Sequence, residues 1–68
     1  MKLSARNQLK GKITSVSKGA TTAHVTIDIG GTLITASITN AAVDELKLED
    51  GKEAYAIIKA SDVMVGVE

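Results

Sequence analysis

The sequence of 68 residues contains no cysteine, phenylalanine or tryptophan, and Tyr55 is its one aromatic side chain. Without cysteine the protein has neither disulfides nor thiolate metal sites. His24 is the only histidine, and the carboxylates do not cluster in the sequence, so we expect no metal ion bound directly by protein side chains. The core must therefore be built from valine, isoleucine, leucine and alanine.

The chain also lacks an excess of charge of either sign. Eight basic residues balance eight acidic ones, which argues against broad attraction to nucleic acid or to an anionic membrane. No apolar run reaches the roughly 20 residues of a membrane helix. The opening residues Met1–Ser4 lack the apolar stretch of a signal peptide. These features predict a cytoplasmic protein that binds neither nucleic acid nor a membrane.

A chain of this length forms one domain, residues 1–68, close to the lower limit for a chain that folds alone. Small domains usually add disulfides, a metal ion or oligomerisation to a thin core. Because the composition removes the first two supports, we expect the protein to form a homo-oligomer.

Apolar and polar residues alternate with a period of two over much of the chain, which predicts β-strands. Gly11 would mark a bulge or bend in the first strand, and Gly30-Gly31 would form a hairpin turn. A short helix capped by Asn40 would end near Lys47. The expected strands cover residues 9–16, 24–29, 33–38, 54–58 and 63–67. This order predicts an all-β fold, a small five-stranded OB-like barrel with one short helix between strands 3 and 4.

Two polar clusters interrupt the expected strands near the two ends of the chain. They consist of Ser4, Ala5, Arg6 and Asn7, and of Lys59, Ala60 and Ser61. Together they offer a guanidinium, an ammonium, hydroxyls, an amide and backbone N–H groups but no carboxylate, which suits a compact oxyanion. For each cluster taken alone, a polar strand end with a solvated or ion-paired cation is the simpler interpretation. Because the first and last strands of a five-stranded barrel often lie close together, the two clusters could share one site.

Other polar residues give weaker indications. The segment around Lys18 and Gly19 could form a nest of N–H groups for an anion, although an ordinary hairpin loop is the simpler interpretation. His24 is expected on the outer face of its strand. No nucleophile is followed by a recognisable base and no carboxylates are paired, so we expect a binding protein and not an enzyme.

The two clusters lie within longer motifs that resemble a known family. Residues 4–11, Ser-Ala-Arg-Asn-Gln-Leu-Lys-Gly, resemble the opening motif of the molbindins, the Mop-type molybdate- and tungstate-binding domains of TOBE type. Residues 57–63, Ile-Ile-Lys-Ala-Ser-Asp-Val, resemble their closing motif. The resemblance covers essentially the whole chain.

The resemblance implies a cytoplasmic protein for molybdenum storage or homeostasis. Molbindins are OB-like barrels that form homohexamers as trimers of dimers, exchange strands, and bind molybdate or tungstate at subunit interfaces. On this chain the first cluster would contact one side of the anion, and the second would approach from the neighbouring subunit. A second type of oxyanion site would involve Lys18, Gly19 and Ala20.

Two other functions stay open from the residues alone. The polar clusters could form interface salt bridges in a purely structural oligomerisation domain. An OB-type module for single-stranded nucleic acid would need stacking aromatics and a basic groove, to which one tyrosine and a net charge of zero fit poorly.

Overall fold

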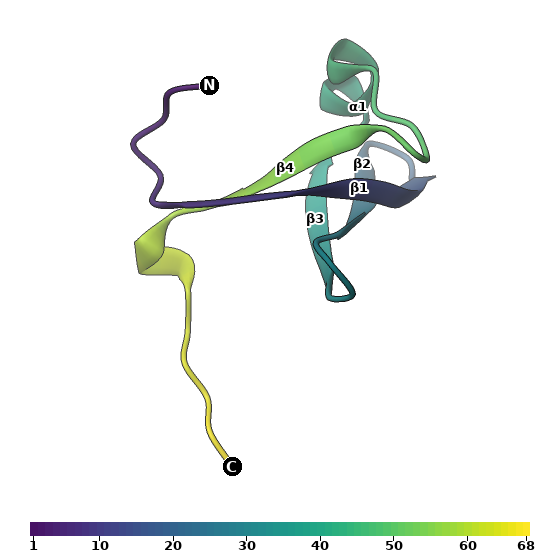
Figure 1. Cartoon of the computed structure of the whole chain (residues 1–68). Coiled ribbons are helices and arrows are strands. Elements are labelled where there is room, and N and C mark those ends of the chain that lie inside the picture. Colours follow the sequence, from purple (N-terminus) through teal and green to yellow (C-terminus); the bar gives the residue numbers. More distant parts are fainter.

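The computed structural model describes residues 1–68 and contains four strands, one α-helix and one short 3-10 helix (Figure 1). Their order is β1 (Asn7–Lys18), β2 (Thr22–Asp28), β3 (Leu33–Thr39), α1 (Asn40–Leu46), β4 (Glu53–Ile58) and η1 (Ala60–Asp62). The strands form one antiparallel sheet in the order β3-β2-β1-β4. The predicted all-β class and the helix between the third and fourth strands are confirmed.

The long strand β1 organises the sheet because it pairs with two neighbours in turn. Its residues 7–12 lie against β4, and its residues 12–18 lie against β2. The register shifts between Ile13 and Ser15, so the bulge lies at Thr14 and increases the local twist. β3 and β4 are the two edges of the sheet and do not pair with each other. The result is a curled, open sheet.

Gly11 has a role other than the predicted bulge. A Cβ atom at this position would lie 2.3 Å from the carbonyl oxygen of Asp28 and 2.9 Å from Cγ2 of Ile27. No side chain fits that space, because one of the two obstacles is backbone. Gly11 therefore permits a close approach of β1 to the end of β2, and the expectation of a bulge at this residue is corrected.

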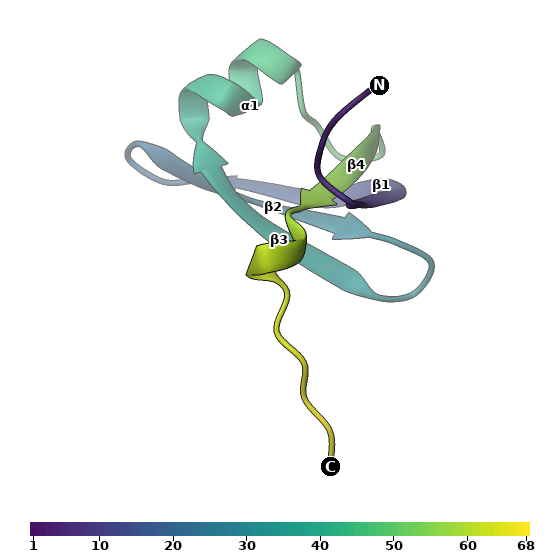
Figure 2. The ribbon, with the colours of Figure 1, turned by 90° about the vertical axis from the view of Figure 1, so that its left-hand side faces the viewer.

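The fifth strand expected over residues 63–67 is not confirmed, and the number of strands is corrected to four. The 3-10 helix η1 follows β4 almost at once and directs the chain away from the sheet (Figures 1 and 2). Beyond it, Val65 is 91% exposed and Val67 is 94% exposed. The alternating pattern is that of a strand, but a strand needs a partner and the chain supplies none to this segment.

The β2–β3 turn agrees with the sequence. Gly30 and Gly31 have φ angles of 92° and 101°, a conformation that glycine adopts without steric cost. The carboxylate of Asp28 accepts hydrogen bonds from both of their N–H groups, at 3.1 Å and 2.7 Å. The predicted hairpin turn is confirmed.

The helix begins one residue earlier than expected. Thr39 is the N-cap, and its hydroxyl accepts a hydrogen bond of 3.1 Å from the N–H of Ala42. Asn40, expected as the cap, is instead the first helical residue, and its side-chain amide donates to the carbonyl of Gly19 at 2.9 Å. The end of the helix agrees with the expectation, since Lys47 follows it in the left-handed region with φ at 54°.

The core is aliphatic, as the composition requires, and it is small. Only six residues are buried: Ile13, Ala23, Val25, Ile27, Val43 and Ala56. α1 lies over one side of the curled sheet (Figure 2) and contributes Val43 to this core. Many large apolar side chains stay exposed, so a single copy buries little of the apolar surface that the sequence provides.

Candidate oxyanion-binding site

The fold brings the two polar clusters together. β1 and β4 are antiparallel, and Asn7 lies opposite Ile58, so the residues before β1 and after β4 meet at one end of the sheet (Figure 1). They line a small cavity of about 210 Å³, and the lining residues are Ser4, Ala5, Arg6, Lys59, Ala60 and Ser61. Six of the seven residues expected from the sequence therefore surround one cavity. Within one chain, both clusters contribute to this cavity.

The cavity carries positive charge that nothing in the chain neutralises. Arg6 and Lys59 are exposed, and neither takes part in an ion pair. The two ion pairs of the structure are elsewhere: Lys10 with Glu53, and Lys18 with Asp44. No carboxylate lines the cavity. Two cations that line one cavity and have no acidic partner form a favourable environment for an anion.

Neutral donors complete the lining. Ser4 and Ser61 contribute hydroxyls, which adjust their direction to a ligand. Ala60 and Ser61 also begin η1, where the first N–H groups of a helix have no partner within the helix. The N–H of Asp62, further along, already donates to the carbonyl of Lys59 at 2.9 Å. The cavity thus combines charged and neutral donors, the set that the oxygens of a small anion require.

Asn7 lies beside the cavity and not among its lining residues. Its Nδ2 donates to the carbonyl of Ile58 at 3.1 Å, in a half-buried position. The next residue, Gln8, donates from Nε2 to the carbonyl of Ala5 at 3.0 Å. Sequence reasoning did not single out Gln8. The register of β1 against β4 reveals the partner of Asn7, whereas the partner of Gln8 is local.

Lys18 is the last residue of β1, and Gly19 and Ala20 begin the β1–β2 turn, at the opposite end of β1 from the cavity (Figure 1). The ammonium of Lys18 is bound to the carboxylate of Asp44 on α1. The N–H of Gly19 donates to the carbonyl of Thr22 at 2.8 Å, and Gly19 is not among the glycines with a positive φ angle. The turn is a hairpin loop without the alternating conformation of an anion nest.

The remaining polar residues do not form a second site with recognisable chemistry. His24 is exposed on β2, opposite Ser17 of β1 and Ser37 of β3, as expected for an outer face. No group of three or more histidine, aspartate or glutamate side chains is placed to hold a metal ion. No helix has both the length and the apolar character needed to cross a membrane.

Comparisons with known proteins agree with the fold and the motifs. The model of the TOBE domain family matches residues 3–65. The chain is 62% identical over 69 residues to a probable molybdenum-pterin-binding protein of Haemophilus influenzae, and the match covers 100% of both chains.

Solved structures show the same architecture. MopII from Clostridium pasteurianum superimposes with a TM-score of 0.91 at 45% identity, covering 97% of this chain and 100% of that one. The cytoplasmic molybdate-binding protein ModG, in a form with molybdate bound, superimposes with a TM-score of 0.95 at 48% identity. This second match covers 100% of this chain and 49% of ModG. The chain therefore belongs to the molbindin family of TOBE domains.

Proposed function

We propose that this protein binds molybdate or tungstate in the cavity between its two polar clusters and serves molybdenum storage or homeostasis in the cytoplasm. The observation that carries the proposal is the cavity itself, in which Arg6 and Lys59 stand unpaired with hydroxyl and N–H donors around them. The names of the relatives support the choice of ion, since they bind molybdenum or molybdate.

The chemistry of the cavity matches a tetrahedral dianion. Removing such an ion from water without compensation would be very costly. Arg6 and Lys59 supply two positive charges, which match the two negative charges of the ion. Charge-assisted hydrogen bonds are about twice as strong as neutral ones. Ser4 and Ser61 can donate to oxygens that the cations do not reach. The set binds and holds an anion, and it contains no group placed for catalysis.

The size of the cavity favours an inorganic ion. Its volume of about 210 Å³ is below the roughly 300–1,000 Å³ of pockets that enclose drug-sized molecules. A bare oxyanion is small enough for this space. Sulfate presents similar oxygen acceptors, so preference for molybdate would rest mainly on the dimensions of the completed site.

The proposal includes assembly into a homohexamer, as a trimer of dimers. An apolar groove of about 660 Å³ runs between the edge strands β3 and β4, and 14 of its 16 lining residues are hydrophobic. The unpaired segment 63–67 has the alternating valines of a strand. A neighbouring copy's segment would supply the missing strand and cover apolar side chains that one copy leaves in water. The anion would then lie at the base of the exchanged segment, beside a subunit interface.

A second oxyanion site at Lys18, Gly19 and Ala20 stays a prediction. Lys18 would have to exchange the carboxylate of Asp44 for the anion, and several copies of the loop would have to meet.

Titration calorimetry tests the main proposal, on protein whose mass has been measured by light scattering. We expect molybdate and tungstate to release heat with a defined stoichiometry on a hexamer, and sulfate to release little. A well-folded hexamer that gives no heat with either metal oxyanion would refute the binding function.

One other function has a specific observation behind it. The small core and the exposed apolar segment would suit a purely structural oligomerisation domain as well. Such a protein would assemble, and its melting temperature would not respond to molybdate.

A further inference from the structure

Two consecutive amide side chains at the start of β1 hold the backbone on both sides of the cavity. Asn7 Nδ2 donates to the carbonyl of Ile58 at 3.1 Å, and Gln8 Nε2 donates to the carbonyl of Ala5 at 3.0 Å. No other side-chain hydrogen bond of the structure involves residues 1–9 or 57–68. These two bonds are therefore the side-chain restraints on the segments that line the cavity, in addition to the backbone pairing of β1 with β4 and the backbone bonds of η1.

Each accepted carbonyl belongs to the peptide unit that immediately precedes one of the two cations. The carbonyl of Ile58 shares its planar peptide group with the N–H of Lys59, and the carbonyl of Ala5 shares its group with the N–H of Arg6. In a trans peptide the C=O and the N–H point in opposite directions and rotate together, and the chain has no cis peptide bond. Fixing the carbonyl therefore fixes the N–H and the Cα of the cation that follows.

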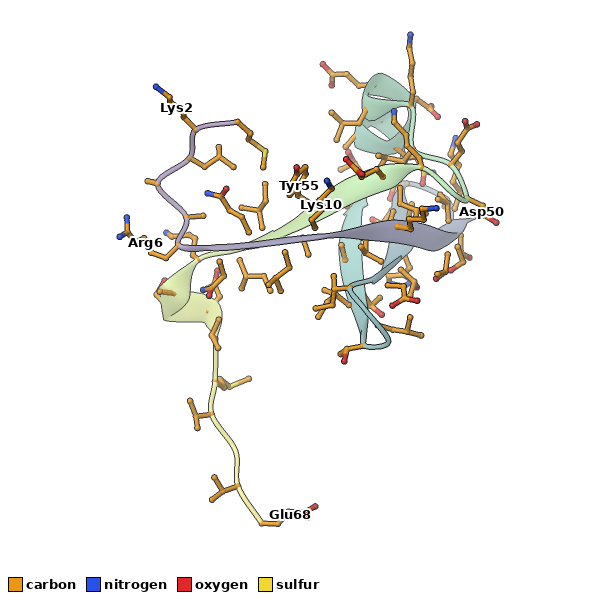
Figure 3. The ribbon with its side chains drawn as sticks, in the orientation of Figure 1. Lys2, Arg6, Lys10, Asp50, Tyr55 and Glu68 are labelled. Carbon is orange, nitrogen blue, oxygen red and sulfur yellow. The ribbon has the colours of Figure 1, made fainter.

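We propose that Asn7 and Gln8 are positioning residues that hold Lys59 and Arg6 in place for the anion. This proposal rests on the proposed oxyanion function. Neither amide needs to touch the ion in this role, which accounts for their absence from the cavity lining. Arg6 lies at the point where the N-terminal segment turns into β1, apart from Lys2 further up the segment (Figure 3). Preorganised donors bind more tightly because the ligand does not bear the cost of ordering them.

The two amides differ in the expected size of their effect. Asn7 is half-buried and joins segments that are 51 residues apart in sequence, so its loss removes the side-chain link between the two walls of the cavity. Gln8 is exposed and makes a local bond across three residues, where water competes well. From the usual net value of a hydrogen bond, Asn7→Ala should raise the Kd for molybdate about tenfold, and Gln8→Ala about twofold to threefold.

The experiment compares Asn7→Ala and Gln8→Ala with Thr39→Ala in the assembled protein. Thr39→Ala removes a side-chain bond of similar length, the N-cap of α1, far from the cavity, and controls for a general loss of stability. Titration with sodium molybdate at several salt concentrations gives Kd and its salt dependence. NMR order parameters of the Arg6 and Lys59 amides, measured without ligand, report positioning independently of binding.

We expect Asn7→Ala to lower the order parameter of Lys59 and Gln8→Ala to lower that of Arg6. Both should weaken molybdate binding while the salt dependence stays that of the wild type, because the charges are intact. The control Thr39→Ala should lose stability and keep its affinity. Wild-type affinity in Asn7→Ala, or an equal loss of affinity in Thr39→Ala, would overturn the positioning role alone. A wild-type protein that binds no molybdate would instead overturn the proposed function and with it the ligand part of this inference.

Discussion

Removing either cation from the cavity should weaken oxyanion binding without unfolding the protein. Arg6 and Lys59 are exposed and make no ion pair or side-chain hydrogen bond within the chain, so Arg6→Ala and Lys59→Ala break no contact that supports the fold. We therefore expect their loss to weaken ligand binding and to leave the stability of the fold nearly unchanged. This separation between binding and stability makes the two variants a sharp test of the site.

The magnitude follows from the kind of contact. A hydrogen bond to a charged group contributes about 1.5–3 kcal/mol, and about 1.4 kcal/mol is a tenfold change in affinity. Each variant should therefore raise the Kd for molybdate about 10- to 100-fold. We expect values in the lower part of this range, because solvent reaches both side chains and screens their charge. Arg6→Lys keeps the charge but loses the planar fork of the guanidinium, and should fall between the wild type and Arg6→Ala.

Titration calorimetry measures these affinities, with Lys2→Ala as the matched control. Lys2 carries the same charge and lies in the same N-terminal segment as Arg6 (Figure 3), but it does not line the cavity. Its loss should change the Kd less than about twofold, as a distant exposed charge does. Unchanged affinity in both Arg6→Ala and Lys59→Ala would refute the site. A loss in Lys2→Ala as large as in Arg6→Ala would show that only net charge matters.

Further predictions concern assembly, packing and ligand linkage. Val65→Lys should dissociate the oligomer, as measured by light scattering, whereas Met64→Lys on the opposite face of the same segment should not. The same oligomeric mass in both variants would contradict strand exchange. Gly11→Ala should lower the free energy of unfolding by about 1–3 kcal/mol in urea titrations, because the new Cβ would meet the Asp28 carbonyl. The control Gly66→Ala, with open space around the residue, should leave the free energy of unfolding unchanged. Molybdate at 100 times its Kd should stabilise the protein by about 2.7 kcal/mol in thermal unfolding. Sulfate at the same concentration should not stabilise it. A Tm that does not respond to molybdate would favour a purely structural oligomerisation domain.

Local patterns were sufficient to predict most of the fold. Alternation and runs of apolar, β-branched residues located four strands, and Gly30-Gly31 identified the hairpin because two positive φ angles are needed there. Details that depend on a hydrogen-bond partner or on a pairing strand were not predicted. Thr39 and Asn40 are both good caps, and only the hydrogen bond to Ala42 decides between them. The alternation of residues 63–67 describes a strand but does not say which chain supplies its partner.

The sequence indicated the residues of the candidate cavity and said less about their arrangement. Residue type alone indicated that both clusters suit an oxyanion, and the antiparallel pairing of β1 with β4 then places them around one cavity. The role of Asn7 could not be predicted from residue type, because an amide in this position could either contact the anion or support the backbone. Its partner, the carbonyl of Ile58, is 51 residues away in the sequence and is found only through the register.

The most direct test of the central claim is a crystal structure of the protein with molybdate, with data collected at the molybdenum absorption edge. We predict an anomalous peak in each copy's cavity, within hydrogen-bonding reach of the side chains of Arg6 and Lys59. A fully assembled protein whose molybdenum peaks all lie elsewhere, with this cavity empty, would contradict the assignment of the site.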